Sequence, residues 1–322
     1  MVQQSHPRRV KAASSAVSVV YDMALGLNLQ NPHAPFRKDV LSFYIRKAAA
    51  GMSESPALME VTFDLGNVTS YLVQRGPLVK QSFAELIDST VIILRAFWAL
   101  RAADLFHMAQ LHTCDLDTFV HDSDSSVSVW FYSMKTSQGR WTSLSFRPLS
   151  RSRLRKGLQL SATEAGARVC SCCAVLALAE IRRRMLPGLR LQTAYGLKRK
   201  KCYSKNFFPF KKSSLLSGQP FQYIKASTMN GLLSKHHGKM PGMPAFAAGC
   251  HPRHYRHVAL STMHFVGSAD TAKVLSTHAK DSTVFQESYK IADLDPDFKA
   301  RHLRVHELSS FAQLTAPERL LL

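Results

Sequence analysis

Residues 82–117 read SFAELIDSTVIILRAFWALRAADLFHMAQLHTCDLD and contain the clearest helical signal in the chain. The first residue, Ser82, stands three positions before Glu85, and this pair is typical of a capping box that opens a helix. Apolar residues then recur at steps of three and four, so one face of the helix is expected to be buried. These residues are Ile87, Val91, Leu94 and Trp98. A second helical stretch is expected to follow through Leu105 and Met108.

After Asp115 the sequence pattern changes from that of helices to that of strands. Residues 126–135, SVSVWFYSMK, alternate small and large side chains, and residues 141–146, WTSLSF, do the same. The residues SQGR between them are typical of a turn. We therefore expect an antiparallel β-hairpin.

Most of the remaining patterns are helical. Residues 63–72, FDLGNVTSYL, are typical of a short capped helix, and a longer helix is expected at about 174–186. Between them, residues 151–157, RSRLRKG, are expected to form a basic linker. Helical patterns return at 256–266, 269–276 and 282–291. The expected fold class is therefore mainly α with a small antiparallel β-sheet, in an α+β arrangement.

The chain carries a large excess of positive charge. It has 42 Lys and Arg against 22 Asp and Glu, a formal net charge of +20, and its 46% hydrophobic content is that of a folded protein. A polyanionic partner is expected, and nucleic acid is the commonest one, because each Lys or Arg set against a phosphate releases counterions. An anionic membrane surface is the weaker alternative. No membrane span is predicted, since Arg95 and Arg101 interrupt the apolar run well short of ~20 residues.

The six cysteines are not spaced like a disulfide framework for a chain of this length, which favours a reducing compartment. Three of them, Cys170, Cys172 and Cys173, form the cluster CSCC and raise the hypothesis of a zinc site completed by Cys202 or a histidine. Structural zinc sites usually bring two well-spaced cysteine pairs, so buried helix cysteines are the favoured interpretation. The chain has no P-loop, no paired-carboxylate arrangement for two metals and no Gly-x-Ser-x-Gly elbow. No metal or other cofactor is predicted.

Four short pieces of the chain occur in a specific order. They are ALRAADLFHMAQLHTCDLD (99–117), FYSMKTSQGR (131–140), HPRHYRHVALST (251–262) and LSTHAKDSTVFQESY (275–289). In this order and spacing they resemble the tyrosine recombinase, or phage integrase-like, family, and they look most like recombinases of eukaryotic mobile elements. The two arginine boxes of the family match Arg101 and Arg256. Its lysine hairpin matches Lys135, and its final box matches His278 and Tyr289.

The resemblance implies a catalytic domain that breaks and rejoins DNA without a cofactor. The Tyr289 hydroxyl would attack phosphorus and form a 3′-phosphotyrosyl intermediate, which conserves the bond energy for rejoining. Arg101 and Arg256 would hold the equatorial phosphate oxygens, because a guanidinium stays charged and grips two oxygens. Lys135 would protonate the departing 5′ oxygen, and His278 would donate a hydrogen bond to the phosphate. The implied activity is the integration or excision of a mobile element.

Two further residues have supporting roles by resemblance. Arg253 would add a third positive contact to the phosphate, and Asp104, one helical turn after Arg101, would orient an arginine. Most family members have histidine where this chain has Arg253, and His254 lies one position out of register. A titratable general base is thus replaced by a fixed cation, which favours an alternative, a catalytically decayed or domesticated copy that binds DNA without exchanging strands. Tyr255 is a second candidate for the nucleophile.

Basic residues outside the four pieces are expected to contact the DNA backbone. They are Arg151, Arg153, Arg155 and Lys156, together with Lys198, Arg199, Lys200 and Lys201. The second group, KRKK, is equally typical of a nuclear import signal or of a solvated loop. A nuclear location is expected if the source is eukaryotic.

Three regions are expected along the chain. Residues 1–59 form a short or eroded N-terminal helical region, residues 60–292 the catalytic domain and residues 293–322 a C-terminal tail. By resemblance, the protein would bind double-stranded DNA as a synapsed homotetramer, with no membrane partner. The C-terminal tail is the candidate for the element that monomers of the family exchange.

Overall fold

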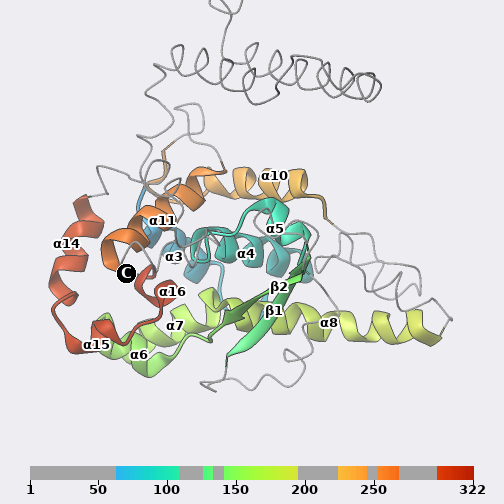
Figure 1. Ribbon diagram of the computed structural model, residues 1–322, viewed down its shortest axis with the longest axis horizontal. Coiled ribbons are helices and arrows are strands. Elements are labelled where there is room, and N and C mark those ends of the chain that lie inside the picture. The colour runs from blue at the N-terminus through green and yellow to red at the C-terminus, as the bar shows by residue number, and fades with distance from the viewer. Residues whose placement is uncertain (1–62, 109–125, 133–140, 195–223, 245–251, 268–295) are drawn as a thin grey trace, which may run out of the picture. The chain divides into compact units, whose positions relative to one another are not determined.

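The computed structural model describes residues 63–108, 126–132, 141–194, 224–244, 252–267 and 296–322. The chain divides into two units, Met1–Glu60 and Val61–Leu322, and all of the described residues belong to the second. The described part of that unit is mainly helical with one two-stranded antiparallel sheet, which confirms the predicted mainly α class with a small sheet (Figure 1).

Helices supply most of the described residues. In chain order the elements are α3 (Leu65–Gln74), the 3-10 helix η3 (Leu78–Lys80), α4 (Phe83–Ala96), α5 (Ala102–Phe106), β1 (Val127–Tyr132), β2 (Trp141–Phe146), α6 (Arg151–Gly157), α7 (Ala162–Cys172), α8 (Ala174–Ala194), α10 (Ala226–His237), α11 (His254–Val266), α14 (Pro296–Val305), α15 (Ser309–Ala312) and α16 (Ala316–Arg319).

The two helices predicted from local capping signals begin where the sequence places them. Asp64 caps α3 by accepting a hydrogen bond from the backbone N–H of Gly66 at 2.8 Å. At the start of α4, the Ser82 side chain accepts from the Glu85 N–H at 3.3 Å, and the Glu85 carboxylate accepts from the Ser82 N–H at 2.9 Å. This reciprocal pair satisfies two backbone donors at a helix start. Both predicted starts are therefore confirmed.

Helix α4 lies at the centre of the fold. It contacts α3, α8, α10 and α11, and every residue from 91 to 100 is buried. The prediction of a single buried face holds only at the start of the helix, because other helices cover the remainder from several sides (Figure 1). Burial of this apolar run stabilises the fold by about 25 cal/mol per Å² of apolar area removed from water. It also encloses a charged side chain, Arg95.

The predicted β-hairpin is confirmed, and it packs beside the end of α4. Strands β1 and β2 pair antiparallel along their whole length. The Trp98 ring stacks on the Phe146 ring with centroids 4.0 Å apart. An isolated β-bridge joins Phe131 to Met108, just after α5. These contacts fix the sheet next to the segment that carries Arg101.

Helix α6 corrects the prediction of a basic linker at residues 151–157. Ser150 caps the helix by accepting a hydrogen bond from the Arg153 N–H at 3.4 Å. Leu154 and Gly157 are buried, so the segment has an inner face despite its four basic residues. One apolar side chain per turn was too weak a signal to reveal that face in the sequence.

Three more helices depart from the sequence-based predictions. Helix α8 continues past its predicted end near residue 186 to Ala194. Helices α7 and α10 lie in segments for which no helix was predicted. For α7 a signal was present, because Ser161 and Glu164 form a capping box at its start.

The C-terminal segment, residues 296–322, packs on its own chain. Helix α15 contacts α6, and α16 contacts α11. The Leu314 side chain fits so closely against α6 that a Cβ on Gly157 would lie 2.7 Å from it. The last three residues, Leu320 to Leu322, are buried. The predicted tail is therefore part of the folded core of this unit.

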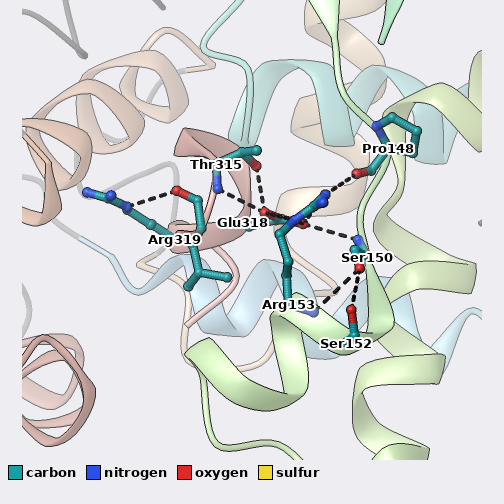
Figure 2. A network of polar contacts seen from close by, with 8 residues as sticks. Pro148, Ser150, Ser152, Arg153, Thr315, Glu318 and Arg319 are labelled. Carbon is teal, nitrogen blue, oxygen red and sulfur yellow. Dashed lines mark hydrogen bonds and ion pairs between the residues drawn. The ribbon is translucent and has the colours of Figure 1, made fainter. Parts of the chain in front are cut away.

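A polar network around Glu318 ties α16 to α6 (Figure 2). Its buried carboxylate accepts hydrogen bonds from the backbone N–H of Ser150 at 3.1 Å and from Nε of Arg153 at 3.0 Å. It also accepts from the backbone N–H of Thr315 at 2.8 Å. Arg153 donates through Nη2 to the carbonyl of Pro148 at 2.9 Å. A buried ion pair thus anchors the tail within the same chain.

Within the described ranges, no single helix has the length and apolar composition needed to cross a membrane. One bent pair, α7 with residues Ala174–Met185 of α8, reaches both criteria together across a bend of 48°.

Candidate active site

The predicted first arginine, Arg101, follows a tight turn between α4 and α5. Ala99 in this turn has φ of 50°, in the left-handed region that a side chain disfavours. The carbonyl oxygens of the turn accept hydrogen bonds from two buried arginines. Arg256 donates through Nη1 to the carbonyl of Ala99, and Arg95 donates through Nη1 to the carbonyl of Leu100 at 2.9 Å. These bonds hold the turn in a conformation that costs free energy.

Arg95 also reaches the segment that carries the predicted second arginine. Its Nη2 donates to the carbonyl of Pro252 at 2.9 Å, directly before Arg253. The residue is only 4% exposed, and its Nε atom has no hydrogen-bond partner among the described residues. One guanidinium group thus bridges the two segments from which Arg101 and Arg256 project.

The charges of this cluster act on one another. The pKa of Arg95 is lowered to about 10, first because the group is buried and second because Arg256 is positive. Asp104 raises it, and Arg101 lowers it further. Of the three charged neighbours, two are positive and one is negative. Arg95 still carries its proton at neutral pH, so the cluster has an excess of positive charge inside the fold.

Asp104 holds the start of α5 and lies against Arg101. Its buried carboxylate accepts a hydrogen bond from the Arg101 N–H at 2.9 Å, and its Oδ2 lies 3.8 Å from Nη1 of Arg101. The Arg101 side chain is 22% exposed, yet its Nη1 is buried and has no hydrogen-bond partner in the described part of the chain. A buried cationic donor of this kind at the edge of solvent is suited to binding an anion.

The start of α11 adds further positive groups. Arg253 is exposed at the N-cap, while His254 and Arg256 are buried in the first turn. The pKa of His257 is lowered to about 4, first by burial and then by the positive charges of His254, Arg253 and Arg256. His257 is therefore neutral at neutral pH. The smaller, electrostatic part of this shift comes from the basic residues that surround His257 at this end of the helix.

Tyr255, the second candidate for the nucleophile, is enclosed in the core. It is 0% exposed, and its hydroxyl lies 2.8 Å from Nδ1 of His237 and 3.3 Å from Sδ of Met240. His237 donates from Nε2 to the carbonyl of Pro244 at 2.6 Å, so in the neutral ring Nδ1 accepts the tyrosine proton. Burial lowers the pKa of His237, which favours that neutral form. The Tyr255 hydroxyl is thus buried away from any DNA at the surface.

Three predicted catalytic residues lie outside the described residues: Lys135, His278 and Tyr289. The predicted DNA contacts Lys198, Arg199, Lys200 and Lys201 lie outside them as well. What the structure does place is the pair of strands that flank residues 133–140. Strand β2 packs through Phe146 against Trp98, three residues before Arg101.

The predicted DNA contacts on α6 differ in accessibility. Arg151, Arg155 and Lys156 are exposed, and Arg155 and Lys156 line a surface hollow together with Ser152. Arg153 instead pairs with Glu318, its Nη2 lying 3.0 Å from Oε1. Three of the four residues can therefore meet a phosphate backbone in this conformation, whereas Arg153 has a structural partner.

The CSCC cluster has the character of core cysteines. Cys172 and Cys173 are buried, and burial raises the pKa of Cys172 to about 12 and that of Cys173 as well. Both thiols are therefore protonated and unreactive at neutral pH. Among the residues that the structure describes, no group of three His, Cys, Asp or Glu side chains could hold a metal ion.

Sequence reasoning missed Arg95 as part of the site. In the sequence, Arg95 was interpreted only as a charge that interrupts an apolar run. A signal was present, because a charged side chain in the middle of a predicted buried helix must find partners inside the protein. Which carbonyls it meets could not be read from the sequence, since Pro252 lies 157 residues away.

Comparison of the chain with family models, with curated proteins and with solved structures found no match in any of the three. Function must therefore be inferred from this chain's own residues.

Proposed function

We propose that this chain is a tyrosine-type DNA recombinase that cuts and rejoins double-stranded DNA, for the integration or excision of a mobile element. The observation that carries the proposal is the cluster of Arg95, Arg101 and Arg256 around one turn, with Asp104 as its acidic member. The sequence resemblance independently assigns Arg101 and Arg256 to phosphate binding. Burial of arginines beside one another costs free energy, and an anionic substrate offsets that cost.

The cluster suits the transition state of phosphoryl transfer. As a nucleophile attacks phosphorus, negative charge spreads over the equatorial oxygens, and preorganised donors stabilise it most in a site with little water. The Arg101 side chain is partly exposed, so its guanidinium is within reach of a bound phosphate, while its buried Nη1 lies 3.8 Å from the Asp104 carboxylate. Arg256 is fixed by its bond to the Ala99 carbonyl.

The proposed reaction balances without a cofactor. The Tyr289 hydroxyl gives its proton to solvent water and its oxygen attacks phosphorus, and the bond between phosphorus and the 5′ oxygen breaks as Lys135 donates a proton to that oxygen. The product is a 3′-phosphotyrosyl ester and a free 5′ hydroxyl. A 5′ hydroxyl of another strand then gives its proton back to Lys135 and attacks the ester, and Tyr289 leaves as a phenolate that takes up a proton from water. His278 donates a hydrogen bond to the phosphate throughout.

DNA itself would be held by the exposed residues of α6 and by KRKK. Arg151, Arg155 and Lys156 face solvent, and each phosphate contact adds affinity that depends on salt. The proposed assembly is a homotetramer synapsed on DNA, in the nucleus if the source is eukaryotic. Its tail would have to leave the Glu318 network before it could be exchanged between monomers.

Two observations favour a second function. Arg253 occupies the position where the family usually has histidine, and the low pKa of the neighbouring His257 makes that ring a poor proton acceptor at neutral pH. A protein that binds DNA without cleaving it needs no proton acceptor at this position. The two functions differ in one product, the covalent adduct.

The test is adduct formation on nicked suicide duplexes drawn from a randomised pool. The chain, its Tyr289→Phe variant and its Tyr255→Phe variant are incubated with DNA, denatured in SDS and resolved by size. We expect an adduct that Tyr289→Phe abolishes and Tyr255→Phe retains. Salt-sensitive binding without an adduct, also on the ends of the source element, would favour the DNA-binding function. No binding at low salt would exclude both.

A further inference from the structure

Arg95 is a buried charged residue near the C-terminal end of α4. A charged side chain that is 4% exposed loses most of its hydration, and in most proteins such a group is paired with a carboxylate or replaced by an apolar residue. The nearest bonded partners of Arg95 are instead two backbone carbonyls. No carboxylate is bonded to it among the described residues, and the favourable influence of Asp104 is opposed by that of two more arginines.

The two carbonyls occupy corresponding places in the candidate site. Leu100 directly precedes Arg101, and Pro252 directly precedes Arg253. Each bond is 2.9 Å long, so the guanidinium sets the distance between the two segments. The bond from Arg256 to the Ala99 carbonyl crosses between the same segments in the opposite direction. Together these bonds brace one arginine segment against the other.

We infer that Arg95 is a positioning residue of the proposed phosphoryl-transfer site, one that fixes Arg101 against Arg256 and adds a constant positive charge behind the phosphate. This inference rests on the proposed function. Arg95 itself is too buried to touch DNA. Arg95 acts on the positions of Arg101 and Arg256 and on the electrostatic potential around them. It should therefore affect the rate of DNA cleavage and not the affinity for DNA.

Arg184 provides a matched control. It too donates to two backbone carbonyls, those of Gln81 at 2.7 Å and Val79 at 3.0 Å. It differs in being paired with Glu180, at 2.6 Å, and in contacting η3 instead of the arginine segments. Arg184→Met removes the same number of carbonyl bonds from the fold and leaves the candidate site untouched.

The test compares the full chain with Arg95→Lys, Arg95→Gln and Arg184→Met. Thermal unfolding comes first, so that each protein is assayed at a temperature where it is folded. DNA affinity, its salt dependence and the rate of adduct formation at saturating suicide duplex are then measured. We expect both Arg95 variants to bind DNA within about threefold of wild type, with the same salt slope, since no phosphate contact is lost. Their adduct rates should fall roughly 10- to 100-fold, as for a misplacement near 1 Å.

Arg184→Met should form the adduct at the wild-type rate even if its unfolding midpoint falls. Arg95→Lys keeps the charge, so it should retain more activity than Arg95→Gln if the charge contributes. An adduct rate in Arg95→Lys and Arg95→Gln equal to that of wild type would overturn the inference. So would equal losses in the Arg95 and Arg184 variants, or failure of both Arg95 variants to fold at every temperature.

Binding of inorganic phosphate tests the positioning role of Arg95 separately from the recombinase function. Phosphate binding to the DNA-free chain is followed by the rise in unfolding midpoint on titration, with Arg101→Met to locate the site. If wild type forms no adduct but binds phosphate through Arg101, and Arg95→Gln weakens that binding, the positioning role stands and the recombinase function fails. If wild type forms neither an adduct nor a phosphate complex, both fail.

Discussion

Glu318 offers the sharpest test of how the C-terminal segment is held. The carboxylate is 0% exposed and accepts from Ser150, Arg153 and Thr315, so no water can replace a lost bond. Replacing it with alanine takes from the Arg153 guanidinium, which is 14% exposed, the buried carboxylate with which it pairs. Breaking a buried pair from one side costs about 3–5 kcal/mol, which corresponds to roughly 6–20 °C in unfolding midpoint for a domain of this size.

Thermal unfolding of Glu318→Ala followed by circular dichroism measures this cost. Glu307→Gln is the matched control in the same segment, because Glu307 is 86% exposed and lies 3.8 Å from His306. The control should shift the midpoint by no more than about 2 °C. Arg153→Met combined with Glu318→Ala should recover part of the loss, since both members of the ion pair are then removed together. A midpoint for Glu318→Ala equal to that of Glu307→Gln would refute the role assigned to this network.

Three further predictions follow from the described residues. The pKa of His302 is lowered to about 4, first by burial and then by His306 and Arg319, so the unfolded chain binds that proton more readily than the folded chain. The contribution of this residue to the free energy of unfolding should be fully present above pH 6.5 and fall as the pH drops toward 4. In urea midpoints measured across this range, His302→Gln should show a smaller fall. Tyr255→Phe should lower the free energy of unfolding by about 1 kcal/mol, through its lost bond to His237, without changing DNA affinity; a loss of DNA affinity in gel shifts would place Tyr255 at the interface after all. Replacing Arg155 and Lys156 together by glutamine should lower the slope of log binding constant against log salt by roughly 2, whereas Arg183→Gln, exposed on α8 and paired with Glu180, should leave it unchanged.

The elements that could be predicted from the sequence are those whose signals are local. The Ser82 and Glu85 pair defines the start of α4 from residues three apart, and the hairpin alternates along each strand. Helix α6 was misread as a linker because its inner face is defined by Leu314 and the rest of the C-terminal segment, more than a hundred residues further along the chain. A pattern with four basic residues in seven gives no hint of such a partner.

The candidate site was predictable only in part, for the same reason. Arg101 and Arg256 were identified through the resemblance, and both lie in the electrostatic surroundings of Arg95. Asp104 was expected to orient an arginine, and it accepts the backbone N–H of Arg101. Arg95 was missed because its partners are carbonyl oxygens, which have no signature in a sequence. Lys135, His278 and Tyr289 remain predictions of the sequence alone.

The most direct measurement of the central claim is to identify the residue that bears the DNA. The adduct formed on a suicide duplex is digested with nuclease and trypsin, and the peptide that carries a residual nucleotide is sequenced by mass spectrometry. We expect a modified peptide covering residues 281–290, DSTVFQESYK, with the nucleotide on its tyrosine, Tyr289. A nucleotide on any other peptide, or tight DNA binding with no adduct on the cognate ends, would contradict the central claim.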